Sequence, residues 1–91
     1  MYAVFISRKG DQEAIQKDFE RFRSYNDQEL VDAYNQEVRM GIVGVHIQQL
    51  CLIALREAMR ERFNHSPILF ESGVIGMQGE VRLVEGKVWF K

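Results

Sequence analysis

The segment from Gly44 to Phe63 constrains the fold most, because its apolar side chains occupy far more than one side of a helix. At 100° per residue they cover a very wide arc, made of Ile47, Leu50, Cys51, Leu52, Ala54, Leu55, Ala58 and Met59. The narrow polar side holds His46, Gln49, Arg56, Glu57 and Arg60, with Ile53 among them. An arc this broad must touch more than one neighbour, so we predict that this helix is the centre of the core.

Two shorter amphipathic helices are predicted before this segment. The first starts with Asp11 as its N-cap and runs to about Ser24. The second starts at Asn26, which forms an approximate capping box with Glu29. Basic and glycine residues mark its end at Gly41. One helix over residues 27–63 would be about 37 residues long and would contain two glycines, so a turn is expected at 41–44.

Strands are predicted at both ends of the sequence. Residues 2–8 alternate β-branched and aromatic side chains, and residues 68–70 form a short apolar run after Pro67. Segments 81–84 and 87–90 flank Glu85 and Gly86, which is the clearest hairpin signal in the chain. A three-residue loop containing Gly86 is the competing interpretation.

A two-residue loop fixes the register of this hairpin. The expected pairs are Val84 with Lys87, Leu83 with Val88, Arg82 with Trp89, Val81 with Phe90, and Glu80 with Lys91. One face is then apolar, while Arg82 and Trp89 meet on the other face as a cation–π pair. Glu80 and Lys91 are expected to form an ion pair.

These elements predict one globular α+β domain over residues 1–91. An N-terminal strand precedes three helices and a C-terminal antiparallel hairpin of two or three strands, and the helices pack on one face of a small sheet. The N-terminal strand is expected to join the C-terminal hairpin. The predicted core contains Val4, Ile6, Phe19, Phe22, Tyr34, Leu50, Ala54, Leu83, Val88 and Phe90.

Charge and cysteine content narrow the classes of function. The formal net charge is −1, which argues against broad electrostatic capture of nucleic acid or of an anionic membrane. One cysteine excludes an intrachain disulfide and a Cys-rich zinc site, and it fits a reducing, cytoplasmic compartment. The apolar run 41–55 is too short and too polar to span a membrane, and the first residues do not resemble a signal peptide.

No pattern in the sequence predicts catalysis, a metal or a cofactor. His46 and His65 lie near opposite ends of the long helix, about 28 Å apart, so they cannot share an ion. Cys51 sits among apolar residues and is expected to be buried and inert. Gly73, Gly76 and Gly79 lack the Lys-Ser/Thr pair and the following helix of a phosphate loop. We therefore do not expect an enzyme.

A small protein–protein interaction module is the preferred interpretation, with a homodimer through the sheet as one form of it. The candidate interface consists of Trp89, Arg82, Lys87 and Lys91, since exposed Trp and Arg are enriched at binding hot spots. Two structural explanations of these residues, without a binding role, stay open. Trp89 can simply pack on Arg82 or under residues 64–79, and the two lysines can serve to discourage edge pairing.

The second hypothesis is a winged helix-turn-helix domain that binds DNA. His46, Gln48 and Gln49 would then reach base edges, and a positive stripe would continue along Arg56 and Arg60. The apolar circumference of the helix, the short acidic loop of the hairpin and the net charge weaken this hypothesis. A protein partner is preferred over nucleic acid.

Overall fold

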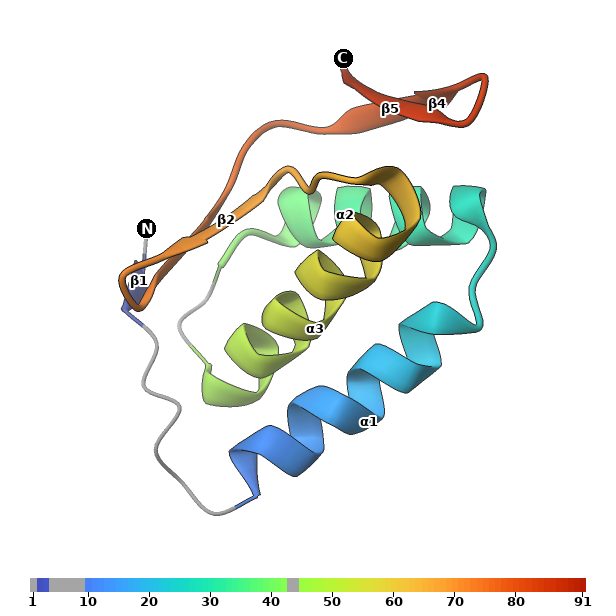
Figure 1. Ribbon diagram of the computed structural model, residues 1–91. Coiled ribbons are helices and arrows are strands. Elements are labelled where there is room, and N and C mark those ends of the chain that lie inside the picture. Colours follow the sequence, from blue (N-terminus) through green and yellow to red (C-terminus); the bar gives the residue numbers. More distant parts are fainter. Residues whose placement is uncertain (1, 4–9, 43–44) are drawn as a thin grey trace.

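The computed structural model describes residues 2–3, 10–42 and 45–91. Its elements are β1 (Tyr2–Ala3), α1 (Asp11–Arg23), α2 (Asp27–Met40), α3 (His46–Phe63), β2 (Ile68–Glu71), β3 (Val74–Met77), β4 (Val81–Val84) and β5 (Lys87–Phe90). The α+β class is confirmed, with three helices followed by two antiparallel hairpins. Figure 1 shows α3 in the middle, with α1 on one side and the strands on the other.

The prediction that α3 is the centre of the core is confirmed. Its buried apolar residues are Leu50, Leu52, Ile53, Ala54, Leu55, Ala58, Met59 and Phe63. The expected polar side was wrong for Gln49 and Ile53, which are both buried, and the apolar arc was wrong for Ile47, which is 76% exposed. Helical periodicity gives the direction of a side chain around the axis, but not how far each neighbour extends along it.

The two shorter helices begin in different ways. In α2 the capping box is confirmed: the backbone N–H of Glu29 donates to Asn26 Oδ1 at 2.8 Å, and the N–H of Asn26 donates to Glu29 Oε1 at 2.9 Å. In α1 the predicted N-cap was wrong. Gly10 holds that position at φ 103°, and Asp11 is the first helical residue, buried with its carboxylate 3.1 Å from His46 Nε2. A contact with α3 therefore replaces the expected local cap.

The predicted register of the β4–β5 hairpin is confirmed at every pair from Val84 with Lys87 to Val81 with Phe90. Its two loop residues, Glu85 and Gly86, both have positive φ, at 51° and 77°, which is the pattern of a type I′ turn. Ser72 and Gly73 join β2 to β3 in the same way, with φ of 53° and 74°. The ion pair between Lys91 Nζ and Glu80 Oε1 is also present, at 3.4 Å.

The pairing expected for the N-terminal strand was wrong. Tyr2 pairs with Ile75 and Ala3 with Val74, so β1 joins the other sheet, whose order is β1-β3-β2, and β4 and β5 form a separate two-stranded sheet. The rest of the predicted strand, including Val4 and Ile6, lies outside the described residues, as do 43 and 44 of the predicted turn. Pairing between distant segments leaves no local trace in the sequence, which is why the partner was misassigned.

Most of the predicted core is confirmed where the structure describes it. Phe22, Tyr34, Leu50, Ala54 and Val88 are buried. Two further members, Phe19 and Leu83, are partly buried against that core. Phe90 was wrong, because it is 52% exposed.

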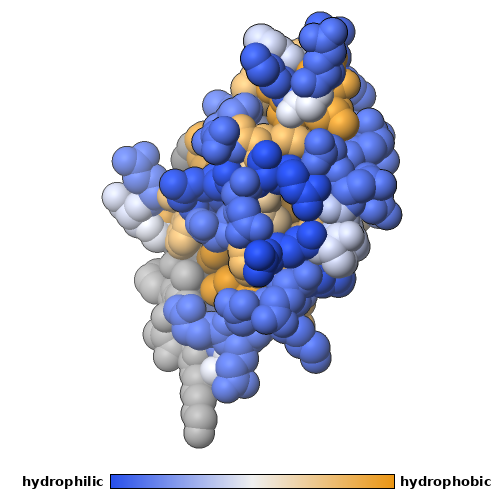
Figure 2. Space-filling view, turned by 45° about the vertical axis from the view of Figure 1, so that its right-hand side comes forward, coloured by the Kyte–Doolittle hydropathy of each residue, from blue (hydrophilic) through white to orange (hydrophobic). Residues whose placement is uncertain are grey.

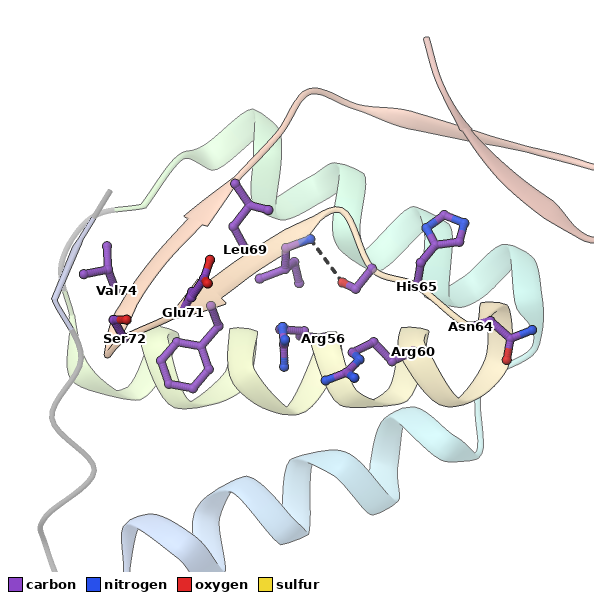
Figure 3. A pocket seen from close by; sticks show the side chains of 11 residues that line it. Arg56, Arg60, Asn64, His65, Leu69, Glu71, Ser72 and Val74 are labelled. Carbon is purple, nitrogen blue, oxygen red and sulfur yellow. Dashed lines mark hydrogen bonds between the residues drawn. The ribbon is translucent and has the colours of Figure 1, made fainter.

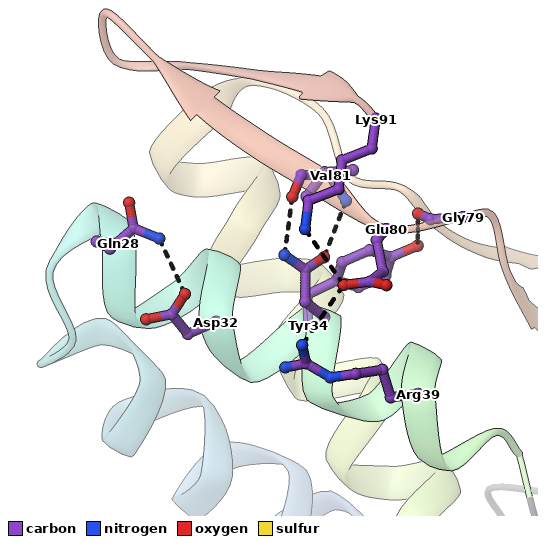
Figure 4. Close-up of polar contacts among 9 residues, drawn as sticks. Gln28, Asp32, Tyr34, Arg39, Gly79, Glu80, Val81 and Lys91 are labelled. Atoms are coloured by element: carbon purple, nitrogen blue, oxygen red, sulfur yellow. Dashed lines mark hydrogen bonds and ion pairs between the residues drawn. The ribbon is translucent and has the colours of Figure 1, made fainter.

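Two neighbouring side chains of α2 hold the connection between the hairpins (Figure 4). The Tyr34 hydroxyl lies 2.7 Å from the carbonyl oxygen of Gln78 and 3.0 Å from that of Gly79. Asn35 Nδ2 donates to the carbonyl of Val81 at 2.8 Å, and the N–H of Val81 donates to Asn35 Oδ1 at 2.8 Å. The side-chain amide of Asn35 thus pairs with β4 as a neighbouring strand would.

We expect Asn35→Ala to lower the free energy of unfolding by about 2–4 kcal/mol, because it leaves the buried N–H and C=O of Val81 without partners. Urea unfolding followed by circular dichroism measures the loss. The control is Gln36→Ala at the next position of the same helix, which is exposed and should stay within about 0.5 kcal/mol of wild type. Equal losses in the two variants would contradict this account.

Stability should also fall at alkaline pH through Tyr34. Burial raises the pKa of its hydroxyl from 10.0 to about 12, so the folded protein holds this proton more tightly than the unfolded chain does. The contribution is fully present below pH 10 and is lost as the pH rises toward about 12. Between these values, the unfolding free energy of wild type should decline more steeply than that of Tyr34→Phe. Parallel pH profiles for the two proteins would refute the assignment.

Candidate functional site

The face of the β4–β5 hairpin that points away from the core carries Arg82, Val84, Lys87 and Trp89, and we call it the outer face. These residues alternate along the strands with the core-directed Val81, Leu83 and Val88, so the strand period of two creates the outer face. Trp89 is 54% exposed and Val84 is 43% exposed. In Figure 2 hydrophobic residues reach the surface at the top of the molecule, over this hairpin, among hydrophilic ones.

The predicted pairing of Arg82 with Trp89 is present in the register, since the two residues lie directly opposite each other. Their cation–π contact is not: the contacts of this kind in the described part of the chain join Arg21 to Phe22, Arg23 to Phe19, and Arg56 to Phe70. The Trp89 ring is therefore not occupied by the cation that the sequence placed beside it.

The two edges of the hairpin differ. Hydrogen-bonded and non-hydrogen-bonded pairs alternate along an antiparallel ladder, and the two-residue turn makes Val84 and Lys87 a bonded pair. Leu83 with Val88 and Val81 with Phe90 are then non-bonded pairs, whose backbone N–H and C=O groups point out of the hairpin. On β4 Asn35 takes both such groups of Val81.

On β5 the outward backbone groups of Val88 and Phe90 have no hydrogen-bond partner among residues 2–3, 10–42 and 45–91. Because β4 is the strand that packs against α2, β5 is the outer strand of the pair. This explains why Val81 is buried whereas Phe90, directly across from it, is exposed. The structure thus offers an open strand edge beside two exposed aromatic side chains.

A hollow of about 420 Å³ lies next to β5, between the hairpin and the end of α3. It is lined by Arg62, Phe63, Asn64, His65 and residues 86–89. Arg62 is held in place there, because its guanidinium donates to Asp27 Oδ1 at 2.8 Å and to the carbonyls of Arg23 and Tyr25. One boundary of the hollow beside β5 is therefore a side chain that three hydrogen bonds hold in place.

The two lysines of the candidate interface are placed differently. Lys91 is paired with Glu80, which also lies 3.6 Å from Arg39 Nη1. Lys87 is exposed and forms no ion pair in the described part of the chain. Lys87 can therefore contact another molecule without breaking an ion pair, whereas Lys91 cannot.

The residues of the nucleic-acid hypothesis do not form one surface. His46 pairs with Asp11, and the Gln48 amide donates to Glu37 Oε2 at 3.1 Å and to the Gly41 carbonyl at 3.0 Å. Gln49 is buried. Arg56 and Arg60 begin about 15 Å further along α3, and both contact the Glu57 carboxylate, at 2.7 and 3.6 Å.

Cys51 lies half-buried on α3 with its Sγ 3.7 Å from Arg21 Nη2. Burial raises the pKa of its thiol from 9.0 to about 11, and the negative charges of Asp18 and Glu37 act in the same direction, whereas Arg21 opposes them. The thiol therefore stays protonated at neutral pH. Across the described residues no three His, Cys, Asp or Glu side chains gather as a metal site would require.

No family model, curated protein or solved structure matches this chain. None of the helices over the described residues is long and apolar enough to cross a bilayer.

The sequence predicted the outer face and the burial of Tyr34, but neither the contact of Asn35 with β4 nor the hydrogen bonds of the Tyr34 hydroxyl. The available signal was an Asn in the interior of a helix, a position where this residue is unfavourable.

We expect Cys51 to react about 100-fold more slowly than an ordinary thiol with a disulfide reagent at pH 8, since the raised pKa leaves little thiolate. Absorbance after adding Ellman's reagent measures the rate. The same protein unfolded in urea is the control and should react as an ordinary thiol does. Equal rates for folded and unfolded protein would show that Cys51 is accessible and ionised.

Proposed function

We propose that this protein is a small, non-enzymatic interaction module that binds a second copy of itself through β5. The observation that carries the proposal is the asymmetry of the hairpin: Asn35 bonds both outward backbone groups of Val81 on β4, whereas β5 combines an open edge with exposed Trp89 and Phe90. An open edge of this kind is a template for pairing with another strand. Dimers with two-fold symmetry are also the commonest oligomers.

The outward groups of Val88 and Phe90 restrict how two β5 strands can pair. If Trp89 faced itself across the axis, Lys87 of each copy would lie opposite Lys91 of the other, and like charges directly opposite are destabilising. If the axis passed through Val88, Lys87 of one copy would lie opposite Trp89 of the other. Among the described residues, Lys87 has no ion pair and no cation lies over the ring of Trp89, so we propose the register centred on Val88.

Pairing through β5 would join two hairpins into one four-stranded sheet. The outer faces of both copies, each with Trp89 and Val84, would then form a continuous surface. The hollow beside residues 86–89 provides room for the incoming strand. The proposal therefore rests on backbone pairing, with the side chains of the outer face selecting the register.

Phe90→Pro tests self-association, because proline removes an N–H that points out of the hairpin and leaves the bonds between β4 and β5 in place. We expect wild type to form a dimer whose fraction rises with concentration, and Phe90→Pro to be monomeric. Phe90→Ala keeps the N–H and should be weakened only in part. Size-exclusion chromatography with light scattering reports the mass.

Val84→Ala on the outer face of β4 is the matched control and should remain dimeric. Circular dichroism and thermal unfolding establish that each variant is folded. A wild-type protein that stays monomeric at millimolar concentration would overturn the proposal. So would a Phe90→Pro variant that is folded and still dimeric.

A further inference from the structure

A second open strand edge lies in the other sheet, on β2. In the sheet order β1-β3-β2 this strand has a neighbour on one side only. A groove of about 790 Å³ runs between β2 and the second half of α3, which is within the size range of ligand sites. Its lining includes Arg56, Arg60, Leu69, Phe70 and Glu71. Figure 3 shows Arg56 and Arg60 side by side on α3, below β2.

The register of the β2–β3 hairpin determines which backbone groups face this groove. Ser72 and Gly73 form the two-residue turn, so Glu71 with Val74 is a bonded pair and Phe70 with Ile75 is not. The groups of Phe70 and Ile68 therefore point outward. The N–H of Ile68 donates to Ser66 Oγ at 3.1 Å. The C=O of Ile68 and both groups of Phe70 have no partner in the part of the chain that the structure describes.

The arginines on α3 match the repeat of a strand added to this edge. Arg56 and Arg60 are four residues apart, which is about 6 Å along a helix. Side chains on one face of a strand repeat about every 6.6 Å. Ile68 and Phe70 point toward α3, as their burial shows, and the Phe70 ring lies 5.9 Å from the Arg56 guanidinium. Residues of an added strand that lie opposite Ile68 and Phe70 would share this face and meet the two arginines.

The charge of the groove favours an acidic occupant. On the α3 side of the groove both Arg56 and Arg60 pair with the single carboxylate of Glu57, so a positive charge remains on that side. Glu71 also lines the groove, but its side chain extends from the opposite face of β2, because it alternates with Phe70. Leu69 shares that opposite face and is 38% exposed. In an added strand with acidic residues opposite Ile68 and Phe70, the residue between them would lie opposite Leu69 and would have an apolar neighbour.

We propose that the groove between β2 and α3 binds an extended segment of a partner protein that carries the pattern acidic, apolar, acidic. The segment would add a strand to β2. Its backbone would pair with Phe70 and with the C=O of Ile68, and its two carboxylates would face Arg56 and Arg60. Backbone pairing would supply affinity, and the alternate side chains would supply specificity. This site is distinct from the surface proposed for self-association.

The proposal is tested by comparing the binding of two short acetylated and amidated peptides. One contains Glu, Leu and Glu in succession, and the other contains Gln, Leu and Gln at the same positions. Fluorescence anisotropy with the full chain should show tighter binding of the acidic peptide, and the difference should shrink as salt is raised. Arg60→Gln should weaken its binding by up to about fivefold. Glu57→Gln should strengthen it, because this change frees both arginines.

Three further samples separate this proposal from its competitors. Methylation of the peptide nitrogens that pair with β2 should abolish binding without changing any side chain. The Phe90→Pro variant should bind the acidic peptide as well as wild type does, so failure of self-association and failure of this site are distinguishable. A single-stranded oligonucleotide serves as an alternative polyanion. Equal binding of the two peptides, or binding of the oligonucleotide alone, would overturn the proposal.

Discussion

The pairing between the side chain of Asn35 and the backbone of Val81 is the contact on which the arrangement of the second half of the chain depends. It places a polar side chain of α2 in the position of a neighbouring strand, with both groups of Val81 bonded at 2.8 Å. Tyr34, the preceding residue, holds the backbone just before β4. Together they determine where the hairpin lies on the helices and which of its two edges faces outward.

The two hairpins are alike in their turns and in the state of their edges. Each is closed by a two-residue turn with positive φ, and each has one edge occupied and one open. In the first hairpin β1 occupies the edge of β3 and β2 is open. In the second, Asn35 bonds the outward groups of Val81 on β4, and β5 is open. The open edges differ in their surroundings: β5 lies beside exposed aromatic residues, and β2 lies beside arginines of α3. We therefore assign them different partners.

Local signals predicted the elements that depend on neighbours in sequence. The pair Glu85 and Gly86 predicted the hairpin register, and Asn26 with Glu29 predicted the start of α2. Contacts between distant segments were not predictable in this way. The strand at residues 2–3 pairs with β3 rather than with the last hairpin.

The candidate site was predictable to a similar extent. Trp89 could be placed on the outer face from the alternation of side chains alone. The exposure of Phe90 could not, because it depends on β4, not β5, lying against α2. The groove beside β2 also required the structure, since Arg56 and Phe70 are brought together only when β2 folds back along α3.

Amide hydrogen exchange at two residues tests the central claim most directly. Val81 and Phe90 lie across from each other in the hairpin, but the amide of Val81 is bonded to Asn35 and that of Phe90 points to an open edge. The account predicts that Val81 is protected at every protein concentration. The amide of Phe90 should exchange quickly in dilute solution and become protected as concentration rises and β5 pairs with a second copy. Exchange at Phe90 that is independent of concentration, or fast exchange at Val81, would contradict it.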